Sequence, residues 1–148
     1  MLVRDALVTN PLVVAPTTTM FELIEAILGS NQTTASVVEN GFLVGTVSAA
    51  DVLRLVIPHY VAMDESLAGV LHATFFEEAL VKLQNVLVGH VMEQPIHTLP
   101  PEAPLMSAVV TFVRHGRKTI PVVDHGRFTG AVTRRSVLRL MRSSVSDR

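Results

Sequence analysis

The sequence repeats itself once, at a spacing of 85 residues. Residues 36–55 read SVVENGFLVGTVSAADVLRL and residues 121–140 read PVVDHGRFTGAVTRRSVLRL, and the two segments align without a gap. A single repeat, unlike a long array, predicts two similar units packed face to face about a pseudo-twofold axis rather than a solenoid. The identical pairs include Val37/Val122, Val38/Val123, Gly41/Gly126, Gly45/Gly130 and Val47/Val132.

Each copy predicts the same order of elements, β-α-β-β-α. In the first copy, an apolar strand at 12–15 precedes a helix that begins at Thr19, where Thr19-x-x-Glu22 has the pattern of a capping box. Strands at 35–39 and 42–47 flank Asn40-Gly41, a strong hairpin signal, and a helix from 49 must end before Pro58. The second copy predicts strands at 96–99, 120–123 and 128–132, with helices at 104–115 and from 134 onward. The fold class is therefore α/β (α+β).

A segment between the copies, residues 58–87, belongs to neither of them. We expect a first unit at 1–57, a helical connector at 58–87, a second unit at 88–143 and a tail at 144–148, all in one compact module. Thr74-x-x-Glu77 predicts another capping box at the start of a helix, and Leu67, Val70 and Leu71 predict a shorter helix before it. Two roles remain open for the connector: it covers the sheet edges, or it forms a dimer surface.

Composition indicates a folded chain with a large core. Hydrophobic residues make up 49% of the 148 residues and charged residues 17%, which is far from the composition of disordered chains. The chain contains no cysteine, and no apolar run approaches the roughly 20 residues of a membrane span. The N-terminal residues lack a signal-peptide pattern, so we expect a cytoplasmic protein with no membrane contact.

The charge is close to zero overall but unevenly distributed. Residues 1–74 carry two basic and seven acidic side chains, whereas residues 75–148 carry ten basic and six acidic ones. This asymmetry is compatible with an anionic ligand of the second half, or with a solvated basic face that meets the acidic half of another subunit.

These features resemble a pair of cystathionine-β-synthase (CBS) motifs, the arrangement called a Bateman module. The resemblance is carried by Pro11 and Pro95 before the first strands, by Pro121-Val122-Val123-Asp124, and by the segment from Gly45 to Asp51. It covers nearly the whole chain. It implies one disc-like unit with ligand clefts between the motifs, and discs that pair into dimers.

The segments GTVSAAD (45–51) and GAVTRRS (130–136) carry the candidate chemistry. Ser48 and Asp51 fit a capping box, and the same helix N-terminus presents backbone N–H groups that suit a phosphate. A carboxylate such as Asp51 can accept the ribose hydroxyl hydrogen bonds, and the resemblance implies this role.

The second copy replaces the aspartate by Ser136 and adds Arg134 and Arg135. Cations oppose the macrodipole at a helix N-terminus, which favours a bound phosphate; pairing with a carboxylate such as Asp51, or solvation, is the alternative. We expect one asymmetric cleft, with ribose at Ser48 and Asp51 and phosphate at Thr133, Arg134 and Arg135.

Other candidates are weaker. The resemblance implies a phosphate contact near Lys118. Val13, Val14 and Ala35 are predicted either to form an apolar slot for the base or to belong to the core. The six histidines lack metal-ligand spacing, and no catalytic signature is present, so we expect neither a metal nor an enzyme.

The sequence thus predicts a stand-alone regulatory module that needs no cofactor. Its ligand would be an adenine nucleotide (AMP, ADP or ATP, with cyclic di-AMP also compatible), and it would signal through a homodimer to an unidentified effector protein. The alternatives are a ligand-free interaction module and a nucleic-acid binder. The nucleic-acid binder is less favoured, because aromatic content is only 5%.

Overall fold

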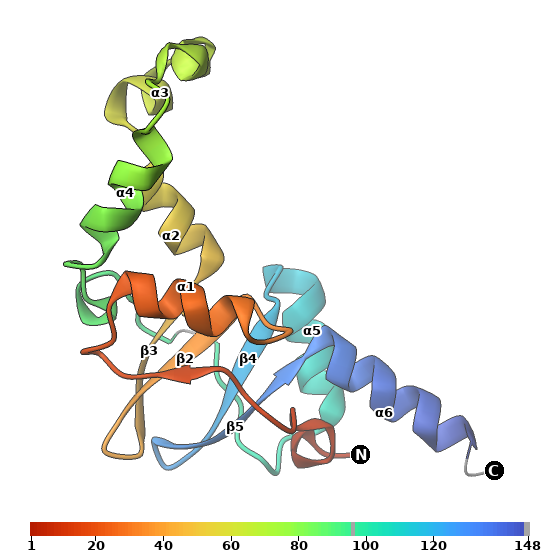
Figure 1. Cartoon of the computed structure of the whole chain (residues 1–148). Coiled ribbons are helices and arrows are strands. Elements are labelled where there is room, and N and C mark those ends of the chain that lie inside the picture. The colour runs from red at the N-terminus through yellow and green to blue at the C-terminus, as the bar shows by residue number, and fades with distance from the viewer. Residues whose placement is uncertain (96, 147–148) are drawn as a thin grey trace.

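A computed structural model describes residues 1–95 and 97–146. Ile96, at the start of the expected strand 96–99, and Asp147 and Arg148, at the end of the expected tail, lie outside the described residues. The fold is mixed α/β, with one five-stranded sheet in the order β1-β2-β3-β5-β4 (Figure 1). The strands are β1 (Val13–Val14), β2 (Thr34–Glu39), β3 (Phe42–Ser48), β4 (Thr119–Asp124) and β5 (Arg127–Thr133).

Each copy contributes two α-helices, and further helices lie between the copies. The first copy has α1 (Met20–Leu28) and α2 (Ala49–Val56), and the second has α5 (Leu105–His115) and α6 (Arg134–Ser146). The intervening segment contains α3 (His59–Met63) and α4 (Phe75–Leu83). Short 3-10 helices span η1 (Val3–Ala6), η2 (Glu65–Val70) and η3 (Val88–His90). Among residues 1–95 and 97–146, no helix is long and apolar enough to cross a membrane.

The two hairpins have matching turns. Asn40 and Gly41 both have positive φ, at 54° and 84°, and the equivalent His125 and Gly126 have 53° and 83°. This pair of left-handed residues matches the twist of the flanking strands. Both hairpins also shift register at the same place, between Val37 and Val38 and between Val122 and Val123. The repeat in the sequence is therefore a repeat in backbone conformation.

The hairpins meet at the pseudo-twofold axis. Phe42 pairs with Arg127 across β3 and β5, and these two positions are equivalent in the repeat. The backbone N–H of Leu43 donates to Gly126 O at 3.1 Å, and that of Phe128 donates to Gly41 O at 2.9 Å. These reciprocal bonds join the two copies into one sheet.

A segment ahead of each copy crosses to the other copy. Val8 N donates to Ala131 O at 2.8 Å, and the equivalent Glu93 exchanges two hydrogen bonds with Thr46, each of 2.9 Å. We call residues 1–8 and 86–93 the crossing segments. Val3 and Ala6 lie in the core of the second copy, whereas Val88 lies in the core of the first. Each core is thus completed by residues of the segment that precedes the other copy.

Two glycines permit these crossings. A Cβ at Gly45 would lie 2.7 Å from Met92 Sδ and 2.9 Å from the Glu93 carbonyl oxygen, and a Cβ at Gly130 would lie 3.1 Å from Leu7 Cδ2. Gly45 and Gly130 are equivalent positions of the repeat, as are Leu7 and Met92. The shared glycine therefore lets the crossing backbone lie directly against the hairpin.

The connector forms an arm. In Figure 1, α3 and α4 stand away from the sheet, and they continue from the end of α2. We call residues 57–82 the arm. Leu83, the residue that follows the arm, is buried in the first core. The arm is therefore anchored at its base. The expectation that the connector covers the sheet edges is wrong for α3 and η2, because they project away from the sheet.

Several predicted boundaries require correction. The strand expected at 12–15 is limited to Val13–Val14, and its counterpart in the described part of 96–99 is a single bridge from Leu99 to Val122. The Thr74-Glu77 capping box does not form; the Thr74 hydroxyl donates instead to Glu78 at 3.1 Å. The helix expected near residues 67–71 is the 3-10 helix η2, and α3 was not predicted. In contrast, Thr19 Oγ1 accepts from Glu22 N as expected.

Gly45→Ala should destabilise the protein, because the added Cβ meets backbone that cannot move away cheaply. Overpacking of this kind costs about 1–3 kcal/mol in the free energy of unfolding, which urea denaturation measures. Gly69→Ala is the matched control, since nothing lies within 4 Å of a Cβ there. Equal stabilities of the two variants would contradict the close crossing.

Candidate functional site

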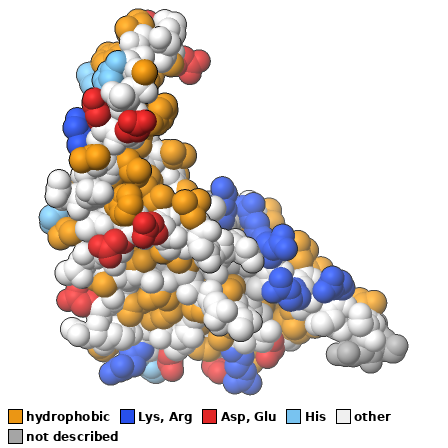
Figure 2. All heavy atoms as spheres, viewed as in Figure 1, with side chains coloured by type: hydrophobic (Ala, Val, Ile, Leu, Met, Phe, Trp, Pro, Cys, Tyr) orange, Lys and Arg blue, Asp and Glu red, His pale blue; other side chains and the backbone are white. Residues whose placement is uncertain are grey.

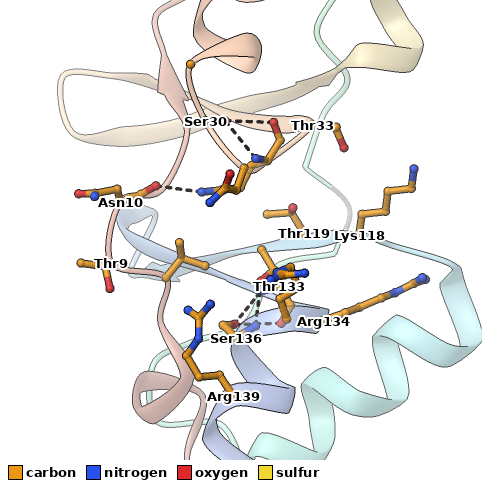
Figure 3. A pocket seen from close by; sticks show the side chains of 15 residues that line it. Thr9, Asn10, Ser30, Thr33, Lys118, Thr119, Thr133, Arg134, Ser136 and Arg139 are labelled. Atoms are coloured by element: carbon orange, nitrogen blue, oxygen red, sulfur yellow. Dashed lines mark hydrogen bonds between the residues drawn. The ribbon is translucent and has the colours of Figure 1, made fainter.

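Two clefts lie at equivalent places of the repeat. Cleft A, of about 350 Å³, is lined by Thr33, Thr34, residues 46–51, Leu53, Glu93 and residues 116–119. Cleft B, of about 580 Å³, is lined by residues 8–10, 29–33, Lys118, Thr119, residues 133–136 and Arg139 (Figure 3). Most of the lining positions correspond at the spacing of 85 residues. Each cleft therefore has a helix N-terminus on one wall and a segment of the other copy opposite.

Asp51 is built into the start of α2. Its Oδ2 accepts from Ser48 N at 2.8 Å and from the Ser48 hydroxyl at 3.2 Å, and Ser48 Oγ accepts from Asp51 N at 3.4 Å. This reciprocal pattern is a capping box. The second carboxylate oxygen, Oδ1, is paired with Arg54. The Asp51 side chain is 7% exposed whereas that of Arg54 is 64% exposed, so a ligand can reach this oxygen if Arg54 swings outward.

Ser136 takes the same structural place at the start of α6. Its hydroxyl accepts from Thr133 N at 2.9 Å and donates to Thr133 O at 2.9 Å, while Thr133 Oγ1 accepts from Ser136 N at 3.1 Å. The two copies therefore share the geometry of the cap, but the cap of the second copy has no carboxylate. Cleft B has no acceptor comparable to Asp51 for a pair of ribose hydroxyls.

The cations of cleft A lie opposite the helix. Arg117 and Lys118 precede β4 and face the wall that carries Ser48 and Asp51. The equivalent positions in cleft B are the neutral Gln32 and Thr33. Cleft A therefore combines the Asp51 carboxylate of the first copy with two cations of the second, and Glu93 of the crossing segment adds a second carboxylate to its lining.

Cleft B has its cations on the helix wall instead. Arg134, Arg135 and Arg139 all belong to α6, and Lys118 lines this cleft as well as cleft A. None of the lining residues is acidic. Figure 3 shows Arg139 rising from α6, while Arg134 runs the other way, toward α5. There Arg134 donates to the Phe112 carbonyl at 3.4 Å, so its position at the cleft is explained without a phosphate.

The residues expected in a single cleft line two clefts. Ser48 and Asp51 line cleft A, whereas Thr133, Arg134 and Arg135 line cleft B. The two clefts share Thr33, Lys118 and Thr119, and the use of both helix N-termini by one nucleotide stays a prediction. Among the predicted residues, only Lys118 lies opposite Asp51 within the same cleft.

Two roles were left open for Val13, Val14 and Ala35, an apolar slot for the base or the core. Ala35 and Val14 are buried in the first core, and Val13 on the edge strand β1 is 42% exposed. None of the three lines either cleft. The alternative, that these small strand residues belong to the core, holds for Val14 and Ala35.

Sequence reasoning missed the other charged lining residues. Neither Arg117 nor Arg139 is among the residues predicted from the sequence. Arg117 follows Gly116, which ends α5 in the left-handed conformation with φ of 60°. A position-by-position comparison at 85 residues would have found both, since it pairs Arg117 with Gln32 and extends the helix wall to Arg139.

A histidine pair lies near cleft A. The rings of His97 and His115 stack with centroids 4.2 Å apart. Burial lowers the pKa of His97, and the nearby charges of His115 and Arg117 lower it further. Within the described part of the chain, no group of three or more His, Asp or Glu side chains is placed to hold a metal ion.

Comparison with known proteins identifies the architecture. The family model of the CBS domain matches residues 3–58 and 88–143. The CBS domain of a CBS domain-containing membrane protein from Sphaerobacter thermophilus is 32% identical, with 95% of this chain and 87% of that chain covered and a TM-score of 0.73. No curated protein matches the chain in sequence.

Two further solved structures share the fold at lower identity. CBSX2, a CBS-pair protein from Arabidopsis thaliana, is 22% identical, with 99% of this chain and 97% of that chain covered and a TM-score of 0.78. A structure of CBSX2 in complex with AMP is 23% identical, with coverage of 96% and 97% and a TM-score of 0.72.

Asp51→Ala should lower the free energy of unfolding by about 1–3 kcal/mol without any ligand, because the N–H of Ser48 loses its acceptor while the Ser48 cap itself remains. Urea denaturation measures the change. Asp51→Asn keeps one acceptor oxygen and should lose less. If Asp51→Ala were as stable as wild type, the capping box would not contribute to folding.

His97 should make the protein less stable in acid. Because its pKa is lower in the folded protein than in the unfolded chain, the unfolded chain binds a proton first as pH falls through about 6.5. The stability that neutral His97 contributes is therefore fully present above about pH 6.5 and is lost as the pH falls below that value. His97→Asn should flatten the fall in melting temperature between pH 7 and pH 5, and an unchanged slope would contradict this assignment.

Proposed function

Because this chain belongs to the CBS domain family and contains the motif twice, we propose that it is a regulatory module that binds an adenine nucleotide between its two CBS motifs. Cleft A is the proposed site, and Asp51, Ser48 and Lys118 are the residues proposed to hold the ligand. Cleft B, with Thr133, Arg134 and Arg135, is proposed as a second place where an anion can bind.

The observation that carries the proposal is the composition of cleft A. A nearly buried carboxylate, Asp51, faces Arg117 and Lys118 across a cavity of about 350 Å³. A nucleotide presents the complementary groups: ribose hydroxyls donate to a carboxylate, and a phosphate pairs with cations. At the N-terminus of α2 the N–H groups of Ala49 and Asp51 are already bonded, to Thr33 O and Ser48 Oγ, so the proposal rests on the side chains of the cleft.

Binding requires one rearrangement. Asp51 Oδ1 is occupied by Arg54, and the exposed Arg54 side chain must leave for the ribose to bind. Since Arg54 is largely solvated, exchanging this ion pair for hydroxyl hydrogen bonds costs little. The solved complex of CBSX2 with AMP supports the choice of ligand, although that protein shares only the fold with this chain.

We propose that the ligand is AMP, ADP or ATP, with cyclic di-AMP as a further candidate, and that no catalytic step follows. Binding would change the stability of a homodimer, which an effector protein would read. The cytoplasmic location inferred from composition belongs to this proposal.

One observation favours the alternative of a ligand-free interaction module: the Asp51 carboxylate already has partners for both oxygens. A nucleic-acid binder is less well supported, since the exposed arginines of α6 are not accompanied by aromatic side chains for stacking.

Isothermal titration calorimetry with AMP, ADP, ATP and cyclic di-AMP tests the proposal. Asp51→Asn should raise the Kd of the bound nucleotide about 10- to 100-fold, because a hydrogen bond to a charged group is worth about 1.5–3 kcal/mol. Lys118→Ala should weaken phosphate-bearing ligands more than adenosine.

Ser136→Ala is the matched control, because Ser136 occupies the equivalent position in cleft B. It should leave the Kd of a nucleotide in cleft A within about threefold of wild type. Equal affinity of wild type and Asp51→Asn, or no binding of any of the four nucleotides, would reject the proposed site.

A further inference from the structure

The arm presents large apolar side chains to solvent along its whole length. Phe76 on α4 is 70% exposed and Met63 on α3 is 75% exposed. A monomer seldom leaves so many neighbouring apolar groups uncovered, because their hydration is unfavourable. Figure 2 shows hydrophobic side chains along the arm and at its base. The exposed apolar residues of the arm are Ile57, Tyr60, Met63, Leu67, Val70, Phe76, Leu80 and Val81.

A second apolar surface lies at the opposite end of the molecule. Helices α5 and α6 enclose a groove of about 500 Å³ whose lining includes Val109, Phe112, Val137 and Met141. Val113 at its rim is 78% exposed. We call this surface the α5–α6 groove. It lies apart from the arm of the same molecule (Figure 1).

The charges of the two surfaces are opposite. The arm contains Asp64, Glu65, Glu77 and Glu78 against the single Lys82. Helix α6 contains four arginines and no acidic residue. Arg134 lines the groove, and Arg135, Arg139 and Arg142 line a neighbouring hollow that shares Leu138 with it. None of the ion pairs among the described residues involves Glu65, Glu77, Arg139 or Arg142. Each surface therefore has unneutralised charge that the other would complement.

Building on the dimer of the proposed function, we infer that the arm of one copy covers the α5–α6 groove of a second copy. A twofold axis makes the contact reciprocal, so that each chain contributes its arm once and its groove once. Apolar side chains of the arm fill the groove, and arm carboxylates face the arginines of α6. The occupant is a second copy because one chain carries both complementary halves.

This arrangement would connect the interface to a ligand cleft. Arg139 lines cleft B, and Arg142 continues the same side of α6 beyond it. An anion in cleft B would neutralise part of the charge that the partner's arm meets. Anion binding in cleft B and dimer strength would then be coupled through α6.

A charge-exchange experiment tests the contact, in the absence of nucleotide. One variant carries Glu65→Lys and Glu77→Lys in the arm, and the other carries Arg139→Glu and Arg142→Glu in α6. Sedimentation velocity gives the dimer Kd of each, and native mass spectrometry identifies the species in an equimolar mixture. Glu39→Lys with Asp124→Lys, at the hairpin ends, is the control, and circular dichroism verifies the fold of all variants.

Wild type should be dimeric, and each double variant alone should have a dimer Kd raised about tenfold or more by like charges. The mixture should form dimers made of one chain of each variant. In such a dimer the lysine-bearing arm faces the glutamate-bearing α6, and the unchanged arm faces the unchanged α6, so both contacts are complementary. Phe76→Ser should weaken the dimer without altering its dependence on salt, and the control should match wild type.

A dimeric wild type whose Kd neither double variant changes would overturn the arm contact while leaving the proposed homodimer intact. A mixture that forms no mixed dimer would also overturn it. A monomeric wild type would overturn both, and nucleotide binding would still be judged separately by calorimetry. If wild type is monomeric and its arm binds another protein, the arm has a different partner and self-association is rejected.

Discussion

The crossing of residues 1–8 and 86–93 is the constraint on which the rest of the structure depends. Met20 N donates to Val86 O at 2.8 Å, and the equivalent Leu105 N donates to Met1 O at 3.0 Å. Since each copy completes its core with a segment that precedes the other copy, neither can fold fully alone. The crossings also supply cleft walls, with Glu93 in cleft A and residues 8–10 in cleft B. The clefts are therefore held by backbone hydrogen bonds and buried side chains.

A shared scaffold carries two different charge patterns. In cleft A the helix offers a carboxylate and the opposite loop offers Arg117 and Lys118. In cleft B the helix offers arginines and the opposite loop, 29–33, is neutral, while Lys118 adds one more cation. The differences between equivalent lining positions, such as Asp51 and Ser136, alter the clefts without touching Gly45, Gly130 or the hairpin turns. This separation allows one fold to hold a nucleotide in one cleft and to respond to anions, or to a partner's arm, at the other.

The sequence predicted the features of the fold that depend on residues close together in the chain. Asn40-Gly41 and the apolar alternation around it were sufficient to predict the hairpin, and Pro58 the end of α2. The cleft that each residue lines could not be predicted, because it depends on how distant segments cross. Asp51 and Arg134 were assigned to one ligand, and they line two clefts that share Thr33, Lys118 and Thr119. Val14 and Ala35 were ambiguous, since small strand residues suit a core and a base slot equally well. The direction of the arm depends on tertiary packing, which periodicity does not encode.

The central claim is that a nucleotide binds in cleft A, between the N-terminus of α2 and the loop before β4. Backbone amide NMR during a titration with AMP tests it most directly, because amide shifts locate the ligand without any substitution. The account predicts that residues 48–51 and 116–119 shift together, with one common Kd. Shifts confined to residues 133–136, or no shift at saturating AMP, would contradict it.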